Sequence, residues 1–370
     1  MTGRAGCRTV RSAKEQWADE TGGGPMKRVA GTIAAALCAV VLVACGSAGG
    51  APTPTAPTAP TTTTSSGSSS PSPTPASFVP AEPPATGPVS SSPPVIPPSP
   101  DSDSPLPPAF SDNESMVWIP AGDHRVPGTL AMPDAQPGQK VPAVLLLHGD
   151  LSSRDENGDM FARSAAAFAA SGIASLRIDF AGSGDTEEPD LALDYPGMVL
   201  DATASLDYLR ADADIDADRV AILGLSRGAG IGATVTGTVP GVAAFVSWSG
   251  AVYDGYDEDP AGHEIARENG YLPVDLGDRI FKLGLNWFDT IEQSHPLDDI
   301  SGYTGPVLAV VGSDDQVVDP DVSTVFLQTV ASADTTLHVV QGADHGFTAE
   351  QSYGDEAIRV TTDWLVSRLG

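Results

Sequence analysis

The amino-acid sequence predicts an α/β domain in residues 111–370, with a mostly parallel sheet and helices on both of its faces. Short apolar runs bounded by turn residues alternate there with longer amphipathic stretches. Alternation of this kind is typical of strand–helix–strand units, which build parallel sheets. The segment is also long enough to bury one large hydrophobic core. We therefore expect a single folded domain.

The apolar runs and amphipathic stretches define the predicted elements in chain order. Strands are predicted at residues 141–147, 173–180, 219–225, 242–248, 306–311 and 336–340, with a candidate earlier strand at 128–132. Helices are predicted at residues 158–171, 198–210, 229–238, 322–331 and 355–369. The interval of about residues 251–303 is too long for a simple connection between elements. We expect it to be a lid insertion.

Charge and cysteine content exclude several classes of function. The 370 residues include 48 acidic and 19 basic side chains, which gives a net charge of −29. A surface this acidic repels phosphate backbones, so we expect no nucleic-acid partner. The three cysteines all lie at or before Cys45, which leaves the rest of the chain without a disulfide framework or a cysteine-based metal site. We expect neither a metal nor a cofactor.

The N-terminal part has the pattern of a bacterial lipoprotein. Met26 is followed by two basic residues and an apolar run at 29–43, which together predict a signal peptide at residues 26–44. The run closes with L-V-A-C, which resembles a lipobox and makes Cys45 the predicted lipidation site. Residues 1–25 carry no hydrophobic pattern and are expected to be an over-extended gene start. Lipidation would anchor the protein to the cell membrane on its extracytoplasmic side.

Residues 45–110 consist almost entirely of Pro, Ser, Thr, Ala and Gly. Such a composition cannot bury enough apolar surface to offset the entropy of ordering, so a disordered linker is predicted. A tether that crosses a cell-wall layer and a spacer that provides length alone would have the same sequence. Both interpretations stay open.

The strongest local signal is the segment G-L-S-R-G at residues 224–228. It follows a predicted strand and precedes a predicted helix, the context in which G-x-S-x-G forms a nucleophile elbow. Such a turn strains the backbone of its serine, and neighbouring chains pass too close for side chains at Gly224 and Gly228. Ser226 is therefore the candidate nucleophile. The backbone N–H of Arg227 opens the next helix and is a candidate oxyanion donor.

A serine hydroxyl needs a base to remove its proton and an acid to orient that base. His345 follows the last predicted strand and so reaches the carboxyl edge of the sheet, where Ser226 also lies. The remaining histidines are expected in a solvated loop (His124), a structural loop (His148), the lid (His263 and His295) and a strand (His338). His345 is therefore the predicted base.

Two neighbouring carboxylates, Asp314 and Asp315, follow the predicted strand at 306–311 and compete for the role of the acid. Asp319 and Asp321 lie further along the chain. The order serine, aspartate, histidine fits an elbow-type site. We favour Asp315, and Asp314 stays open as the alternative.

Four motifs carry a resemblance to a known superfamily: L-H-G at 147–149, D-F-A-G-S-G-D at 179–185, the elbow, and G-S-D-D-Q-V-V at 312–318 with G-A-D-H at 342–345. From about residue 141 onward the chain resembles α/β-hydrolases, most of all cinnamoyl/feruloyl esterases and dienelactone-hydrolase-like proteins. The resemblance implies a triad of Ser226, Asp315 and His345, because the family's G-x-x-D pattern falls on Asp315.

The resemblance also implies that the residue after His-Gly, here Asp150, supplies a second backbone oxyanion donor. A carboxylate there departs from the family pattern, and its side chain is expected to point into solvent. If it cannot, Leu151 becomes the donor. Arg227 is a second departure, and its guanidinium either offsets Asp150 or reaches solvent.

The predicted function is hydrolysis of short-chain or aryl carboxylic esters through an acyl-enzyme, with a neutral small-molecule ester as substrate. Trp287 and Phe288 of the lid either line an apolar substrate pocket or pack the lid's own underside. A serine peptidase of the same fold is the first alternative, with Glu264, Glu268 or Asp275 binding a substrate amine. A catalytically silent cell-surface binding module is the second. The oligomeric state is not predicted.

Overall fold

The structure is a computed structural model that describes residues 112–370 apart from 256–258 and 278. The predictions for residues 1–25, 26–44 and 45–110, including lipidation of Cys45, lie outside the described residues. Within the described part of the chain, no helix combines the length and apolar character needed to cross a bilayer.

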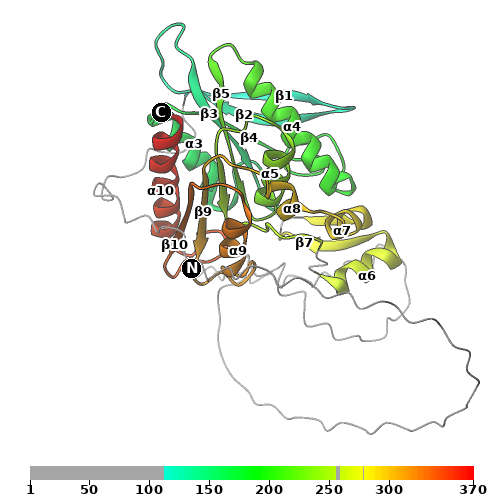
Figure 1. Ribbon diagram of the computed structural model, residues 1–370. Helices are drawn as coiled ribbons and strands as arrows, with labels where there is room; N and C mark the ends of the chain where they lie inside the picture. Colours follow the sequence, from blue (N-terminus) through cyan, green and yellow to red (C-terminus); the bar gives the residue numbers. More distant parts are fainter. Residues whose placement is uncertain (1–111, 256–258, 278) are drawn as a thin grey trace, which may run out of the picture. The chain divides into compact units, whose positions relative to one another are not determined.

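A central sheet of eight strands organises the domain (Figure 1), in the order β1-β2-β4-β3-β5-β6-β9-β10. The strands are β1 (Glu114–Ala121), β2 (His124–Ala131), β3 (Val141–Leu147), β4 (Ala174–Ile178), β5 (Ile215–Leu225), β6 (Phe245–Trp248), β9 (Val307–Gly312) and β10 (Thr335–Val340). From β4 to β10 neighbouring strands are parallel, whereas β1 and β2 run antiparallel at one edge. The predicted class, a mostly parallel α/β sheet, is confirmed.

Helices cover both faces of this sheet. They are α3 (Met160–Ala170), α4 (Tyr195–Ala211), α5 (Arg227–Thr238), α9 (Asp321–Thr329) and α10 (Gln351–Leu369), with short 3₁₀ turns η1 (Asn157–Asp159) and η2 (Asp190–Ala192). In Figure 1, α3 and α10 lie on one side of the sheet, and α4 and α5 lie on the other.

Strand β3 shows why both faces need cover. All seven of its residues are buried, and successive side chains of a strand point to opposite faces. Val144 and Leu146 belong to the core beneath α3 and α10, whereas Leu145 and Leu147 belong to the core beneath α4 and α5. A continuous apolar run is therefore what a central parallel strand requires.

The predicted insertion lies between β6 and β9 and has structure of its own. It contains α6 (Pro260–Asn269), the antiparallel pair β7 (Tyr271–Asp275) and β8 (Ile280–Gly284), α7 (Leu285–Glu292) and α8 (Pro296–Ile300). Helix α8 packs closely on α5, since a Cβ added at Gly237 would lie 2.0 Å from the Asp299 carbonyl oxygen. From here on, the name lid is kept for the part of this insertion from α6 to α7.

The N-terminal edge of the sheet differs from the prediction. The candidate strand at 128–132 is the end of a longer β2, and β1 was not predicted. A two-residue turn joins the two strands, with Gly122 at a φ of +60° that glycine adopts without strain. His124, expected in a solvated loop, is instead the first residue of β2, and its Nε2 is 2.7 Å from the buried carboxylate of Asp201.

Candidate active site

Ser226 occupies the sharp turn between β5 and α5. Its backbone has φ 53° and ψ −119°, a conformation that non-glycine residues rarely adopt. The turn is held by its backbone groups: the Ser226 N–H donates to the Trp248 carbonyl at 2.9 Å, and the Ser226 carbonyl accepts from Ala251 N–H at 3.0 Å. Strain of this kind persists only where the surrounding structure over-determines it, and such places cluster at functional sites.

The two glycines of the elbow are required by close backbone contacts. A Cβ added at Gly224 would lie 2.2 Å from the Gly228 carbonyl oxygen, and one at Gly228 would lie 1.9 Å from the Leu147 carbonyl oxygen. Real Cβ atoms do not approach oxygen so closely. The G-x-S-x-G spacing thus follows from the close packing of α5 against β5 at Gly224 and against β3 at Gly228, as the sequence predicted.

Asp315 and His345 form a hydrogen-bonded pair at the carboxyl ends of β9 and β10. His345 Nδ1 donates to Asp315 Oδ2 at 2.8 Å. The other carboxylate oxygen, Oδ1, accepts from the backbone N–H groups of Val317 and Val318 at 2.8 and 3.0 Å. The Asp315 side chain is fully buried and that of His345 is 11 % exposed. A carboxylate fixed in this way holds the imidazole in one orientation and stabilises its protonated form.

The loops that carry Asp315 and His345 are in close backbone contact. A Cβ added at Gly312, the last residue of β9, would lie 2.3 Å from the Ala343 carbonyl oxygen. Asp314, the alternative acid, is exposed, and its Oδ1 accepts from the hydroxyl of its neighbour Ser313 at 2.9 Å. Of the two carboxylates that the sequence left open, Asp315 is therefore the one that contacts His345.

Ser226 lies at the same edge of the sheet, because parallel β5, β9 and β10 all end there. Among the described residues, no hydrogen bond joins Ser226 Oγ to His345. The structure thus brings Asp315 and His345 into contact and places Ser226 at the same edge of the sheet, and a triad of the three residues stays a prediction. Such contacts are often long in a free enzyme and tighten when substrate binds.

The Asp150 side chain does not point into solvent, and that expectation is wrong. Its Oδ2 accepts from Arg227 Nε at 3.2 Å, and its Oδ1 accepts from the indole Nε1 of Trp287 at 3.3 Å. The carboxylate is only 19 % exposed and the guanidinium is 1 % exposed. The offset of Asp150 by Arg227 is therefore the arrangement present, because burial of either charge requires an opposite partner.

The two lid aromatics have different surroundings. Trp287 and Phe288 are both buried on α7 and meet edge to face at 4.9 Å. Phe288 stacks on His263 at 5.0 Å, so it packs the inside of the lid. Trp287 faces Asp150, and the Arg227 guanidinium carbon lies 5.9 Å from its ring centroid. A substrate pocket lined by these two side chains stays a prediction.

Sequence reasoning missed Glu156. Its side chain accepts a hydrogen bond from the Gly149 N–H at 2.5 Å, directly after β3. The signal that could have found it is a carboxylate seven residues after the His-Gly pair, in a loop otherwise rich in small polar residues. His148 has the structural role expected of it: Nδ1 donates to the Gly149 carbonyl and Nε2 accepts from Phe180 N–H.

Tyr195 bonds to α5, the helix that follows the Ser226 turn. Its hydroxyl donates to the Gly230 carbonyl at 3.2 Å and lies 2.8 Å from Thr234 Oγ1. Burial raises the pKa of Tyr195 to about 12, against a smaller lowering by the hydrogen bond with Thr234. The phenol therefore stays protonated near neutral pH and can keep donating to α5.

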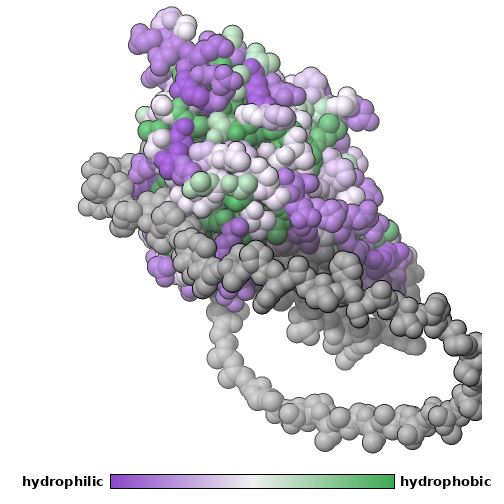
Figure 2. Space-filling model, viewed as in Figure 1, coloured by the Kyte–Doolittle hydropathy of each residue, from purple (hydrophilic) through white to green (hydrophobic). Residues whose placement is uncertain are grey.

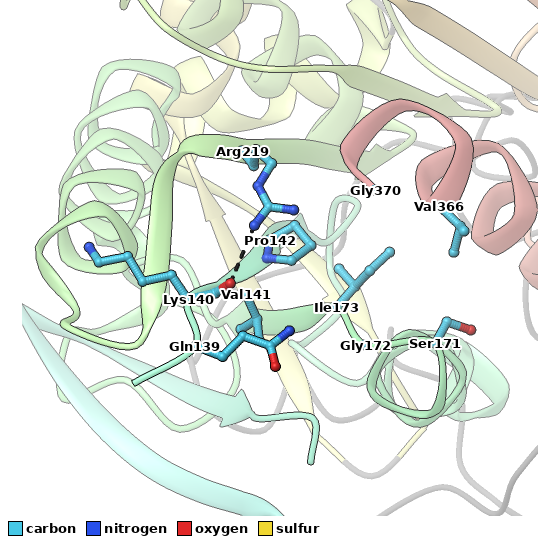
Figure 3. A pocket seen from close by; sticks show the side chains of 10 residues that line it. All are labelled: Gln139, Lys140, Val141, Pro142, Ser171, Gly172, Ile173, Arg219, Val366 and Gly370. Atoms are coloured by element: carbon cyan, nitrogen blue, oxygen red, sulfur yellow. Dashed lines mark hydrogen bonds between the residues drawn. The ribbon is translucent and has the colours of Figure 1, made fainter. Parts of the chain in front are cut away.

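One cavity among the described residues is lined by a set that does not include Ser226. Figure 3 shows it between the first residues of β3, the turn after α3 and the end of α10, with a volume of about 250 Å³. Arg219 closes one side, donating to the carbonyls of Lys140 and Leu369 at 3.3 and 2.9 Å. In Figure 2 the surface over the loops that precede β3 and β5 is hydrophilic. The cavity is at the amino edge of the sheet and so is separate from the candidate active site.

The sheet topology and the elbow define the fold of this domain as the α/β-hydrolase fold, and the buried Asp–His pair lies where that fold places a site. Residues 194–366 match the family model of the dienelactone hydrolase family. The matched segment includes Ser226, Asp315 and His345 and begins after the loop that carries Asp150 and Glu156. A comparison with curated protein sequences finds no significant match.

Solved structures of hydrolases have the same fold. Est1E from Butyrivibrio proteoclasticus, solved with ferulic acid, is 20% identical and matches 68% of this chain and 99% of its own, with a TM-score of 0.56. The esterase domain of a Rhodothermus marinus protein is 21% identical over 70% of this chain and 99% of its own, with a TM-score of 0.53. An acylaminoacyl peptidase from Pyrococcus horikoshii is 15% identical over 71% of this chain and 42% of its own, also at 0.53.

Proposed function

We propose that the domain is a serine esterase that cleaves short-chain or aryl carboxylic esters through an acyl-enzyme. The observation that carries the proposal is the buried Asp315–His345 hydrogen bond at the sheet edge where the strained Ser226 turn ends β5. An orienting carboxylate, a base and a serine hydroxyl at one edge are the parts that acyl transfer needs.

In the proposed mechanism His345 Nε2 accepts the hydroxyl proton while Ser226 Oγ bonds to the ester carbonyl carbon. The bond from that carbon to the alcohol oxygen then breaks, and His345 donates its proton to the departing alcohol. Water reverses the sequence, with His345 as base, and releases the carboxylic acid. Asp315 stabilises the imidazolium of each step and keeps its own charge.

The oxyanion is held by the N–H of Arg227, at the first residue of α5, and by an N–H of the loop after β3. Because the Asp150 carboxylate does not point into solvent, Leu151 is the favoured donor of this loop and Asp150 is the alternative. Each such donor contributes about 3 kcal/mol to the lowering of the barrier. The positive end of α5 adds to this stabilisation.

A neutral substrate suits the charge of the site. The Arg227 guanidinium already pairs with Asp150 and therefore retains little attraction for a substrate carboxylate. The net charge of −29 also disfavours anionic esters at long range. The lid carboxylates considered for a peptidase, Glu264, Glu268 and Asp275, are exposed, and Glu264 pairs with Arg267 on its own helix. An amine-binding subsite is thus less well supported than an ester site.

The test is hydrolysis of p-nitrophenyl esters from acetate to decanoate by the purified full chain and by its Ser226→Ala variant. We expect turnover of short esters that disappears in the variant. Matched peptide p-nitroanilides distinguish the peptidase alternative. If the folded wild type is no faster than the variant on every ester and every anilide, the hydrolase activity is refuted and a binding role takes its place.

We further propose that Cys45 carries a lipid and anchors the protein on the extracytoplasmic side of the cell membrane. The support is the lipobox-like L-V-A-C after a signal-like apolar run. Metabolic labelling with a radioactive fatty acid should label the wild-type chain and leave Cys45→Ala unlabelled and outside the membrane fraction. A labelled Cys45→Ala chain would disprove the assignment.

A further inference from the structure

The carboxylate of Glu156 ties together the loop that follows β3. Oε1 accepts from the Gly149 N–H at 2.5 Å. Oε2 accepts from the Ser152 hydroxyl at 2.7 Å and from the Asn157 N–H at 3.2 Å. One side chain, 9 % exposed, therefore holds both ends of the loop at residues 149–152.

This loop lies directly against the candidate nucleophile. The point where a Cβ would stand on Gly149 is 3.3 Å from Ser226 Cβ and 3.5 Å from Glu156 Oε1. Gly149 is thus packed between the serine and the glutamate, and a small shift of its backbone changes the position of the next N–H relative to Ser226. Glu156 can set that position without touching a substrate.

The bond from Gly149 also restricts which residue can hold an oxyanion. Its N–H is donated to Glu156 and is unavailable to a substrate. The donors that remain on this loop are the N–H groups of Asp150 and Leu151. Leu151 has a φ of 59°, which turns the chain sharply just after Asp150. The direction in which these two N–H groups point depends on how the loop is held.

Glu156 itself has an unusual backbone, with φ 60° and ψ 168°. Side-chain-bearing residues avoid this region, and strained residues persist where the structure needs them. The conformation is fixed by Glu156 N–H, which donates to the Ser153 carbonyl at 3.0 Å, and by Asp159 N–H, which donates to the Glu156 carbonyl at 3.2 Å. Glycine would adopt this turn without strain, so a glutamate here is explained by its carboxylate.

We propose that Glu156 is a positioning residue for the oxyanion site: its carboxylate fixes the Gly149 backbone so that the N–H of Asp150 or Leu151 points to the oxygen of an acyl group on Ser226. The inference rests on the proposed esterase function. It assigns a role in catalysis to a residue that does not contact the reacting atoms.

Three substitutions of Glu156 distinguish the effect of its side-chain length from the effect of its charge. Glu156→Gln keeps the length of the side chain and an oxygen that accepts from Gly149, but its NH₂ group at the Oε2 position can only donate to Ser152 Oγ and loses the bond from the Asn157 N–H. Glu156→Asp keeps the charge and withdraws the carboxylate by one methylene. Glu156→Ala removes the acceptor. Asp201→Asn is the matched control, since Asp201 is also a buried carboxylate that accepts a loop N–H, from Ala181 at 2.8 Å, and bonds to His124 of β2, three strands from β5 in the sheet.

The experiment measures single-turnover acylation by p-nitrophenyl acetate, kcat, KM and the melting temperature in the full chain. Loss of one oxyanion donor costs roughly 100- to 1,000-fold in rate, so a misdirected donor should cost roughly 10- to 100-fold. We expect that fall in acylation for Glu156→Asp and Glu156→Ala, with KM changed by less than about threefold, because the ester binds before charge develops. Glu156→Gln should acylate near the wild-type rate, because the Gly149 N–H keeps its acceptor, with a lower melting temperature, because the Asn157 N–H loses its own. Asp201→Asn should lower the melting temperature with little change in acylation.

Two results would overturn the positioning role: wild-type acylation by a folded Glu156→Asp, or a Glu156→Gln as slow as Glu156→Asp. Should Glu156→Ala fail to fold, the Asp and Gln variants still decide. Failure of the esterase function itself looks different, because the wild type would then be no faster than Ser226→Ala. An active wild type with unaffected Glu156 variants refutes the positioning role alone.

Discussion

Asp315→Asn should nearly abolish ester hydrolysis, for a reason visible in the hydrogen bonds of this carboxylate. Oδ1 accepts from two backbone N–H groups, those of Val317 and Val318. An asparagine must therefore place its oxygen there and its NH₂ group at the Oδ2 position, 2.8 Å from His345 Nδ1. An NH₂ group donates, so Nδ1 must accept, and the imidazole proton moves to Nε2.

A proton on Nε2 prevents His345 from acting as the base toward Ser226. The same loss of the correct tautomer in a serine protease triad lowers kcat by roughly 10⁴-fold, which corresponds to about 5 kcal/mol of barrier. Both backbone donors keep their acceptor, so the fold should be retained. The effect should therefore fall on kcat, with a small change in KM.

The assay is p-nitrophenyl acetate hydrolysis by Asp315→Asn, with Asp314→Asn as the neighbouring control. Asp314 is exposed and bonds to Ser313, so its amide variant should keep activity within about twofold of the wild type. A folded Asp315→Asn that retains a tenth of wild-type activity, while Ser226→Ala is inactive, would refute this reasoning. A large loss in Asp314→Asn would show that the wrong carboxylate was chosen.

Two further predictions concern stability. Gly228→Ala places a Cβ 1.9 Å from the Leu147 carbonyl oxygen, so urea unfolding should show a loss of roughly 3 kcal/mol or more although alanine favours helices. Gly302→Ala, with open space around it, should change stability by less than about 0.5 kcal/mol. Burial lowers the pKa of His124, but Asp201, Asp123 and Glu188 outweigh this and raise it above 6.5. The bond to Asp201 thus stabilises the fold below that value for as long as Asp201, whose own pKa is raised by burial, stays ionised. The bond loses strength as the pH rises through the folded-state pKa of His124, so His124→Phe should cost roughly 2 kcal/mol near pH 5.5 and less near pH 9.

The parallel core was predictable because its strands are apolar on both faces, and the periodicity of the helices between them is clear. The residues 141–147 were predicted at their observed bounds for this reason. The β1–β2 hairpin was not, because Pro120 and Pro127 interrupt its pattern and proline is uncommon inside strands. The interior of the lid was also beyond local reasoning, since its short helices and strands depend on contacts with the rest of the domain.

Some residues of the candidate site were likewise predictable from the sequence and others were not. Ser226 and His345 could be named because Ser226 directly follows a predicted strand and His345 lies five residues after the end of another, and a parallel sheet brings such positions to one edge. The surroundings of Asp150 could not, because its partners Arg227 and Trp287 are 77 and 137 residues away in sequence. The role of Glu156 was not predicted for a related reason. Its side chain bonds back to its own loop, and this depends on a backbone conformation that sequence patterns do not indicate.

The position of Trp287 gives the protein an optical reporter of its lid. Its indole, on α7, is buried beside a carboxylate and a guanidinium of the core domain, and indole emission depends on nearby charge and water. Movement of α7 away from Asp150 must therefore change the fluorescence of this side chain. The fluorescence change that is absent in Trp287→Phe reports the motion of the lid. It can be recorded over time together with product release, so that lid motion and turnover are compared in one sample without an added dye.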